Sequence, residues 1–408
     1  MARRPQIGIF GRRNTGKSSL INVLSGQDVS IVSDVPGTTT DPVRKIMEIH
    51  GIGPVVLIDT AGMDDEGMLG EKRVLRSKEI IWQVNLAILI FTENFLGAYE
   101  KNLIKDFRLQ EVPFFLLHNM SDKVPLDPGI EGEIIRDLKA EVMDFSCKEP
   151  DNMEQLISMI SKNLGPSPFK TIPMLDGLVG ENDKVILVCP IDTQAPEGRL
   201  ILPQVQVIRE VLDRRAIAVV LQETQLPSYF RNTGKEQDRQ PVLVVTDSQL
   251  FGRVEQMIPP DQPLTGFSIL LARSKGDFNA YMEGTQAIDG LRDGDRVLFI
   301  ESCSHHSTCE DIGRVKLPGM LQKYTGKKLV CEMISGLDRP KRPLKDYALI
   351  IQCGGCMITQ RQVMSRIRET QKAGVPVSNY GLAIAFTQGV FHRAIEPFKK
   401  MTDQNKSI

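Results

Sequence analysis

The 408-residue sequence has neither an excess of charge of one sign nor a long apolar run. Its formal net charge is −1 at pH 7, so no global basic field favours nucleic acid or an anionic membrane surface. No apolar run reaches the roughly 18 residues that a membrane span needs. The first strand is expected close to the N-terminus, which leaves no room for a signal peptide. We therefore expect a cytoplasmic protein that binds neither nucleic acid nor membrane.

Cysteines are few and unevenly placed. The chain has seven, an odd number, which argues against a disulfide framework in a protein that is not secreted. Five of the seven follow residue 300. This skew predicts a metal or redox site in the C-terminal third. The chain length allows two or three domains, each able to bury its own core.

A phosphate-binding loop is the strongest motif. Residues 11–18, GRRNTGKS, fit the pattern of glycine, four residues, glycine, lysine and serine. The apolar run at 7–10 predicts a buried strand before the loop, and the run at 20–24 predicts a helix after it. Backbone N–H groups of such a loop converge on phosphate oxygens at a helix N-terminus. We expect Lys17 to reach the β- and γ-phosphates and Ser18 to bind Mg²⁺.

Two further motifs fit the switch loops of a nucleotide hydrolase. Thr39, in the turn-rich segment 36–41, suits a loop that closes over Mg²⁺ and the γ-phosphate. The buried strand expected at 55–58 ends in Asp59, which would hold Mg²⁺. The N–H of Gly62 would then contact the γ-phosphate.

The next motifs fit a guanine-binding pocket. The strand expected at 114–117 delivers Asn119 and Asp122, and an aspartate here can accept two hydrogen bonds from guanine that adenine cannot offer. Ser146 and Lys148 fall where the last guanine-facing loop belongs. The five motifs in this order predict a GTPase of the P-loop fold. The expected catalytic residues are Lys17, Thr39 and Gly62, and the expected nucleotide-binding residues are Gly11, Asn14, Thr15, Gly16, Lys17, Ser18, Ser19, Asp59, Asn119, Asp122, Ser146 and Lys148.

Roughly the first 165 residues resemble the translation-factor-like GTPases of tRNA modification and ribosome assembly. Asn14 stands where potassium-activated members carry a K⁺-binding asparagine, and a loop-stabilising side chain is the alternative role. Met63 follows Gly62, so no glutamine can orient the attacking water. The resemblance implies that K⁺ supplies the charge that an arginine finger would otherwise provide. The guanine motif has Met120 where lysine is normal, and this departure predicts weaker or less selective guanine binding.

Beyond residue 166 the apolar pattern predicts two parallel-sheet α/β modules, because strands alternate with helices. The expected fold class is α/β, with three consecutive domains at 1–166 (P-loop GTPase), 167–265 and 266–408. The middle module shows no phosphate loop and no ligand cluster, so we expect it to be a spacer or a self-association module, and we favour homodimerisation. Its buried strands are expected at 185–188, 216–221 and 242–245, and its helices at 203–213 and 248–257.

The last module places cysteines at the ends of strands. Cys303 and Cys353 each close an expected strand, and Cys356 is expected to open the next helix. Ligands in open α/β sheets bind beyond the carboxyl ends of strands, so these thiols can converge at one edge. The expected strands are 296–300, 329–333 and 347–352, and the expected helices are 278–291, one from about residue 311, 357–373 and 387–401.

Three thiolates suit soft metals, notably an iron–sulfur cluster or zinc. The glycines at 354–355 let the backbone pass close to a cluster and donate N–H groups to its sulfurs. A helix N-terminus at Cys356 would lower the pKa of that thiol. Cys353 and Cys356 alone could instead form a thioredoxin-like redox pair, but Cys303 and His305 favour a metal site.

The other four cysteines, Cys147, Cys189, Cys309 and Cys331, are expected to be structural. Cys331 lies inside an apolar strand and is expected in the core. Cys189 and Cys309 are expected to pack rather than to bind metal.

Cys303-x-His305, followed after 47 residues by Cys353-x-x-Cys356, resembles the signature of the HydF family, the GTPases of FeFe-hydrogenase maturation. With the GTPase motifs, the resemblance spans the whole chain. It implies a 4Fe–4S cluster on Cys303, Cys353 and Cys356. It also implies a scaffold or carrier, a homodimer or dimer of dimers, that receives a diiron precursor and passes it to apo-hydrogenase. Radical-SAM maturases would build the ligands of that precursor.

The fourth iron ligand is open, because Gln352 stands where the family often has a histidine. His305 is the nearest candidate, followed by His306, by a carboxylate such as Asp192 or Glu301, and by solvent. A weakly held fourth position would let the unique iron accept a bridging ligand from the diiron precursor.

Two other functions fit parts of the sequence. A tRNA-modification or ribosome-assembly GTPase with a structural zinc would need a basic surface patch, which the balanced charge does not support. A GTPase fused to a thiol–disulfide oxidoreductase would need only the Cys353–Cys356 pair.

Overall fold

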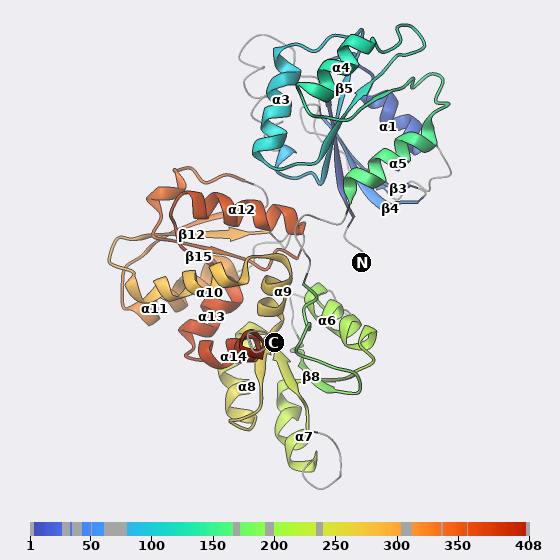
Figure 1. Cartoon of the computed structure of the whole chain (residues 1–408). Coiled ribbons are helices and arrows are strands. Elements are labelled where there is room, and N and C mark those ends of the chain that lie inside the picture. Colours follow the sequence, from blue (N-terminus) through green and yellow to red (C-terminus); the bar gives the residue numbers. More distant parts are fainter. Residues whose placement is uncertain are drawn as a thin grey trace. The chain divides into compact units, whose positions relative to one another are not determined.

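The protein folds into two compact units, Met1–Lys170 and Thr171–Ile408, drawn in Figure 1 from a computed structural model. Sheets of mainly parallel strands, flanked by helices, build both units, and this confirms the predicted α/β fold class. The structure describes residues 4–26, 33–34, 43–49, 51–60, 80–165, 172–191, 200–233, 240–302, 312–335, 338–356 and 358–404.

The first unit is built around a seven-stranded sheet of order β2-β3-β4-β1-β5-β6-β7. The pairs β2–β3 and β3–β4 are antiparallel, and the other pairs are parallel. Its strands are β1 (Gln6–Gly11), β2 (Ser33–Asp34), β3 (Val43–Ile49), β4 (Gly53–Asp59), β5 (Leu86–Phe91), β6 (Phe114–His118) and β7 (Val142–Asp144). Its helices are α1 (Lys17–Ser25), α3 (Ala98–Leu109), α4 (Pro128–Arg136) and α5 (Met153–Leu164).

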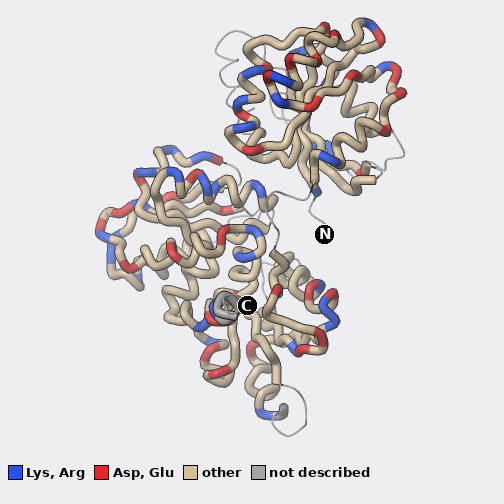
Figure 2. Tube along the Cα trace, in the orientation of Figure 1, with Lys and Arg blue, Asp and Glu red and all other residues tan. Residues whose placement is uncertain are grey.

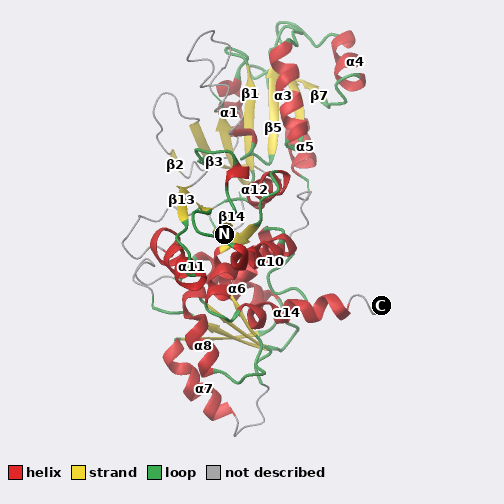
Figure 3. Ribbon diagram, turned by 90° about the vertical axis from the view of Figure 1, so that its left-hand side faces the viewer, coloured by secondary structure: helices red, strands yellow, loops and turns green. Residues whose placement is uncertain are grey.

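Helices cover both faces of this sheet, as Figure 1 and Figure 3 show together. Leu20 of α1 and Leu156 of α5 pack into one core, and Phe107 of α3 and Ile134 of α4 pack into the other. The central strand β5 is buried along its whole length, which is typical of a parallel strand covered on both faces. No prediction from the sequence covers β5, because a short apolar run without a motif does not distinguish a strand from a buried helix.

The second unit contains two four-stranded sheets, and all their pairs are parallel. The first, of order β11-β10-β8-β9, is made of β8 (Lys184–Val188), β9 (Ile217–Leu221), β10 (Leu243–Thr246) and β11 (Leu264–Gly266). The second, of order β13-β12-β14-β15, is made of β12 (Arg296–Glu301), β13 (Val330–Ser335), β14 (Leu349–Gln352) and β15 (Val377–Asn379). The helices are α6 (Leu202–Asp213), α7 (Leu226–Thr233), α8 (Phe251–Met257), α9 (Phe267–Lys275), α10 (Phe278–Gln286), α11 (Leu317–Thr325), α12 (Gln360–Lys372), α13 (Tyr380–Thr387) and α14 (Phe391–Gln404).

One hydrophobic core joins the two sheets of the second unit. It includes Ile186 on β8, Leu270 on α9 and Leu298 on β12. The C-terminal helix α14 returns to the first of these sheets, where the Thr265 hydroxyl donates to the carbonyl oxygen of Ala394 at 3.0 Å. The predicted boundary between residues 265 and 266 falls within β11, and the division into three domains stays a prediction.

Three expectations about single segments are wrong. Cys331 is exposed on β13, which is one of the two edge strands of its sheet. The strand β9 is also an edge strand, and its Ile217 and Val220 are 50% and 45% exposed rather than buried. The helix expected to start at residue 387 starts at Phe391, because α13 ends before it and Gly389, with a φ of 78°, separates the two helices.

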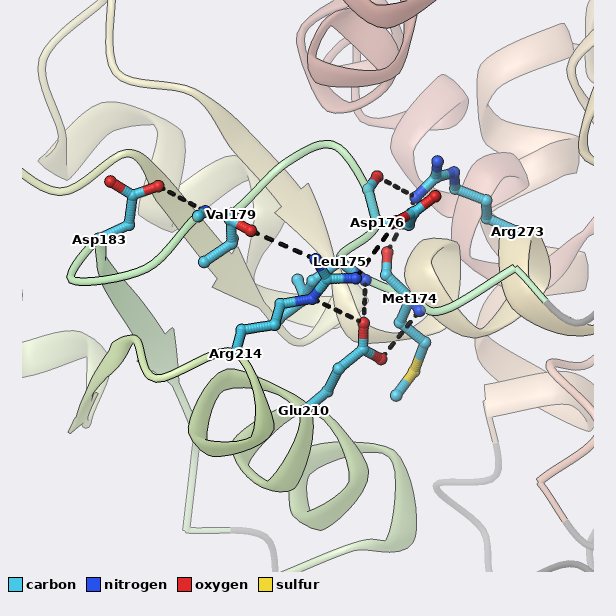
Figure 4. A network of polar contacts seen from close by, with 9 residues as sticks. Met174, Leu175, Asp176, Val179, Asp183, Glu210, Arg214 and Arg273 are labelled. Carbon is cyan, nitrogen blue, oxygen red and sulfur yellow. Dashed lines mark hydrogen bonds and ion pairs between the residues drawn. The ribbon is translucent and has the colours of Figure 1, made fainter.

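A network of polar contacts anchors the start of the second unit (Figure 4). The Glu210 carboxylate of α6 accepts hydrogen bonds from the backbone N–H of Met174 at 2.9 Å and of Leu175 at 2.8 Å. The Arg214 guanidinium lies 3.3 Å from the same carboxylate. Arg273 of α9 donates to the carbonyl oxygen of Met174 at 3.1 Å. The network therefore holds the turn at the start of this unit against both α6 and α9.

The network predicts that Glu210→Ala destabilises the second unit. Met174 is buried, so the substitution removes charge-assisted hydrogen bonds and leaves N–H groups without an acceptor. We expect a loss of about 2 kcal/mol in the free energy of unfolding, measured by chemical denaturation. The control is Asp213→Ala, which removes an exposed carboxylate that pairs with Arg209 on the same helix. Equal stability of the two variants would contradict the assigned role.

Candidate functional site

The motifs of the first unit meet at one edge of its sheet. The phosphate loop follows β1, Asp59 ends β4, Asn119 follows β6 and Ser146 follows β7. These four strands run parallel within the order β4-β1-β5-β6-β7, so their carboxyl ends lie at the same edge. Sites that bind ligands in open α/β sheets form at this edge.

The phosphate loop needs its two glycines for reasons of space and backbone conformation. Gly11 has a φ of 148°, and a Cβ there would collide with the carbonyl oxygen of Ile90. Gly16 has a φ of 93°, and a Cβ there would collide with the side-chain amide of Asn119. The helix α1 begins directly after Gly16, at Lys17, so the N–H groups of its first turn lie beside the loop.

Two side chains of the loop are those expected to bind phosphate and Mg²⁺. The Lys17 amine is buried and donates to the carbonyl oxygens of Gly11, at 3.0 Å, and Arg12. The Ser18 hydroxyl donates to Oδ2 of Asp59 at 2.9 Å. Within the described part of the chain, the buried Oδ1 of Asp59 accepts no hydrogen bond, and burial raises the pKa of this carboxyl. Hard oxygen ligands of this kind fit Mg²⁺, whose charge would offset the cost of burying the carboxylate.

The guanine-facing residues are linked to the phosphate loop. The Asn119 amide donates to the carbonyl oxygen of Thr15 at 2.8 Å and accepts from the N–H of Cys147 at 3.1 Å. Asp122 accepts from the Ser146 hydroxyl at 2.8 Å. Asn119 therefore joins two loops that are distant in sequence, and Ser146 orients the carboxylate that is expected to read guanine.

Three more residues complete this part of the site. Lys148 lies 4.0 Å from the carboxylate of Asp122. Met120 has a φ of 69°, a left-handed backbone that is uncommon for a residue with a side chain. Burial raises the pKa of the Cys147 thiol to about 11, so it stays a neutral thiol at neutral pH.

Arg12 belongs to the phosphate loop but was not among the predicted site residues. Its guanidinium makes an ion pair of 2.7 Å with Glu100, which is 1% exposed. It also lies over the rings of Phe95 and Tyr99, at 5.2 and 5.4 Å from their centroids. These contacts fix the phosphate loop to the start of α3. One part of this arrangement can be seen in the sequence. Gly97 and Glu100 have the spacing of a helix N-terminal cap, and the Glu100 carboxylate accepts from the N–H of Gly97.

A second group of predicted site residues lies in the second unit, beyond β12 and β14. Gln352 at the end of β14 pairs with Ile300 of β12, and the N–H of Cys353 donates to the carbonyl oxygen of Ile300 at 2.9 Å. The N–H of Ser302 donates to Sγ of Cys353 at 3.0 Å. The two strand ends that precede Cys303 and Cys353 are therefore in contact.

The expectation that Cys356 opens a helix is wrong. Helix α12 begins at Gln360, and its N-terminal cap is Thr359, whose hydroxyl accepts from the N–H of Gln362 at 3.3 Å. Cys356 lies in the loop before this cap, so it does not occupy the helix N-terminus that would lower the pKa of its thiol. Gly355 has a φ of 65°, which glycine adopts without strain.

Gln352 is engaged within the fold. Its side chain is buried, and its amide donates to the hydroxyl of Tyr281. The backbone carbonyl oxygen of Gln352 accepts from the Asn379 side-chain amide at 3.3 Å. Among the residues that the structure describes, no three metal-binding side chains cluster. Several residues named in the predictions lie outside the described residues. They are Thr39, Gly62, Met63, Asp192, Cys303, His305, His306 and Cys309.

Family comparisons agree with this arrangement. The family model of the "Hydrogen maturase F dimerization domain" matches residues 174–276. The family model of the "Hydrogen maturase F tetramerization domain" matches residues 279–397. Together they cover more than half of the chain. The chain belongs to the hydrogen maturase F family. The resemblance inferred from the GTPase motifs and the cysteine spacing is thereby confirmed.

The N-terminal part of this family member is a GTPase domain. Residues 6–120 match the description "50S ribosome-binding GTPase". This match confirms the predicted GTPase and, with it, the binding of GTP or GDP and Mg²⁺. The two hydrogen maturase F domains that follow are oligomerization domains.

Curated relatives share the GTPase domain. The tRNA modification GTPase MnmE of Nitrosomonas eutropha is 32% identical over 161 residues, which are 39% of this chain and 35% of the relative. MnmE of Nitrosomonas europaea is 38% identical over 128 residues, which are 31% of this chain and 28% of the relative. The chain therefore spans about a third of the length of these relatives.

Two solved GTPase structures are also similar. Era of Aquifex aeolicus, bound to GDP and AlF4⁻, has 18% identity and a TM-score of 0.34, and the match covers 55% of this chain and 97% of Era. The G domain of the iron transporter FeoB of T. maritima has 19% identity and a TM-score of 0.32, over 40% of this chain and 99% of that domain.

Charge is locally uneven although it is balanced in total. Figure 2 shows Lys and Arg interspersed with Asp and Glu in both units. A groove of about 970 Å³ beside the edge strand β13 is nevertheless rich in cations. Its charged lining residues are Arg296, Arg314, Arg339, Lys341, Arg342, Glu332 and Asp338. The whole-chain net charge of −1 could not reveal this local basic surface.

No helix among the described residues is long and apolar enough to cross a membrane.

The geometry predicts that Asp122→Ala weakens guanine-nucleotide binding by about 100-fold, because two charge-assisted hydrogen bonds to the base are lost. Competition of GTP and ATP against a fluorescent GDP analogue measures both affinity and base selectivity. The control is Asp151→Ala, which removes an exposed carboxylate from the turn that precedes α5. Unchanged GTP affinity in Asp122→Ala would contradict the assignment.

Proposed function

We propose that this protein is a cytoplasmic maturation GTPase that carries a 4Fe–4S cluster. It receives a diiron precursor, whose ligands radical-SAM maturases build, and passes it to the apo-form of an FeFe-hydrogenase. The observation that carries this proposal is the contact between two strand ends, where the N–H of Ser302 donates to Sγ of Cys353 at 3.0 Å. Ser302 directly precedes Cys303. Membership of the hydrogen maturase F family supports the same role.

Cys303, Cys353 and Cys356 are the proposed cluster ligands. Consecutive Cα atoms are about 3.8 Å apart, so a backbone that touches Cys353 at Ser302 allows the next residue to share a cluster with it. A backbone N–H directed at a cysteine sulfur also stabilises the negative charge of iron–sulfur sites. The described residues of this region therefore fit the cluster, whose role is to supply an iron to which the diiron cargo can attach.

His305 is the proposed fourth ligand, with His306, Asp192 or solvent as the alternatives. Glu301 suits this role less well, because its carboxylate lies 3.6 Å from Arg314. The side-chain amide of Gln352 donates a hydrogen bond to the Tyr281 hydroxyl, so Gln352 is not proposed as the fourth ligand. A fourth ligand that exchanges would leave a place for a bridging ligand from the diiron precursor. Cluster spectra that stay the same when precursor is added would contradict this role.

GTP acts as the switch in this proposal. Ser18, Thr39 and Asp59 hold Mg²⁺, and Lys17 and Gly62 contact the γ-phosphate. Hydrolysis removes the γ-phosphate and releases the loops of Thr39 and Gly62, which then act on the neighbouring oligomerization domains. We place the domains at 1–166, 167–265 and 266–408.

The cluster assignment predicts about four irons per chain in wild-type protein purified without oxygen. Cys303→Ser and Cys356→Ser should lose this iron and acid-labile sulfide yet hydrolyse GTP at the wild-type rate. The control is Cys331→Ser, because Cys331 is exposed on β13.

Colourless protein with one zinc would instead support an RNA-modification or ribosome-assembly GTPase, the class to which MnmE belongs by its description. Metal-free protein with a reducible Cys353–Cys356 bond would support a thiol–disulfide oxidoreductase.

The proposed potassium site predicts faster GTP turnover in KCl than in NaCl of equal concentration. Asn14 is exposed in the phosphate loop, with a left-handed backbone of φ 63°. Its amide oxygen suits a monovalent cation, and Asn14→Ala should abolish the difference in turnover between the two salts. A difference that persists in this variant would assign the salt effect elsewhere.

The proposed homodimer uses the open edge of the first sheet in the second unit. Ile217 and Val220 on the edge strand β9 are 50% and 45% exposed, and Val205 and Leu212 on α6 are 45% and 59% exposed. Both elements lie within the residues that match the dimerization domain. Exposed apolar side chains beside an unpaired strand edge favour association with a second copy.

This interface predicts that Val220→Lys shifts the protein toward monomer, because a charged side chain on an edge strand opposes pairing. Light scattering after gel filtration measures the mass. The control is Leu109→Lys, at an apolar residue of α3 that is 66% exposed. A wild-type mass for Val220→Lys would place the interface on another surface.

A further inference from the structure

Two cations, Lys275 and Arg366, lie around the cysteine loop of the second unit. Lys275, at the end of α9, is 2% exposed. Its amine donates to the carbonyl oxygens of Gly355, of Cys356 at 3.4 Å and of Ile358 at 2.9 Å. One side chain from a distant part of the sequence therefore holds three carbonyl groups of the loop that carries Cys356.

Arg366 acts on the other strand end. It is half-buried on α12, and its guanidinium donates to the Ser302 hydroxyl at 2.7 Å. The N–H of Ser302 donates in turn to Sγ of Cys353. Burial lowers the pKa of Arg366, but an arginine stays charged at neutral pH. This chain of hydrogen bonds links a fixed positive charge to the sulfur of Cys353.

Removing a cation from water is costly unless nearby groups interact with its charge. Lys275 and Arg366 together contact three carbonyl oxygens and one hydroxyl, and neutral hydrogen-bond donors could make the same contacts. Lysine and arginine add positive charge beside two cysteines, which bind metal as anionic thiolates. Residues that contact metal ligands orient those ligands and tune the metal, and replacing such residues typically lowers metal affinity or activity by about 10–100-fold.

We propose that Lys275 and Arg366 are positioning residues of the cysteine site. Lys275 fixes the Cys353–Cys356 loop, and Arg366 fixes Ser302 against Cys353. Their two charges offset the negative charge of the thiolates and of the cluster that these thiolates hold. The proposal rests on the proposed function, because it requires an iron–sulfur cluster at this site.

The test uses full-length protein loaded with iron and sulfide under anaerobic conditions. Lys275→Met and Arg366→Met should retain iron about 10–100-fold less well than wild type in competition with a chelator. The remaining cluster should have a more negative reduction potential, because positive charge near a cluster favours its reduced state. Lys275→Arg and Arg366→Lys should restore the potential, and GTP turnover should match wild type in all four variants.

The control is Lys372→Met, which removes an exposed cation from the same helix as Arg366. Should the methionine variants not fold, Ser302→Ala removes only the hydroxyl that Arg366 contacts, and it should weaken iron retention in a folded protein. Wild-type iron retention or an unchanged potential in the variants would overturn the proposal. Wild-type protein that holds no iron would overturn the proposed function instead, so the two failures are distinguishable.

Discussion

Parallel strands that end at a common sheet edge are the constraint on which both sites of this protein depend. In the first unit, four strand ends bring together the phosphate loop, Asp59, Asn119 and Ser146. In the second unit, β12 and β14 end side by side, which brings Ser302 into contact with Cys353. Residues far apart in sequence meet at these edges because each strand delivers the residues that follow it to the same side of the sheet.

The two sites share a way of holding a glycine-containing loop. In the first unit the buried amine of Lys17 binds carbonyl oxygens of its own loop, at Gly11 and Arg12. In the second unit the buried amine of Lys275 binds carbonyl oxygens of a loop that is distant in sequence. In each case a positive charge lies close to the place where an anion is expected. In the first unit the anion is a phosphate, and in the second unit it is a cysteine thiolate that binds metal.

The edge strands β9 and β13 of the second unit present different surfaces. The strands β9 and β13 each end a sheet, and β9 carries exposed apolar residues while β13 borders a cationic groove. The core that joins these sheets, with α14 returning to β11, couples them within one unit.

The sequence by itself determined the GTPase motifs, the α/β class and the family, because each motif is a local pattern directly after an apolar strand. It also determined that Cys353 follows a strand end. Only the tertiary structure decided that Cys331 is exposed and that β9 forms an edge, since strand order is not encoded in local periodicity. It likewise decided that α12 begins at Gln360 rather than at Cys356, because the Thr359 cap sets the start of the helix.

The contacts of Arg12, Lys275 and Arg366 were also decided by the tertiary structure alone. They join residues between 64 and 88 positions apart in the chain. No local pattern encodes such pairs, because they form only when the sheets and helices are packed.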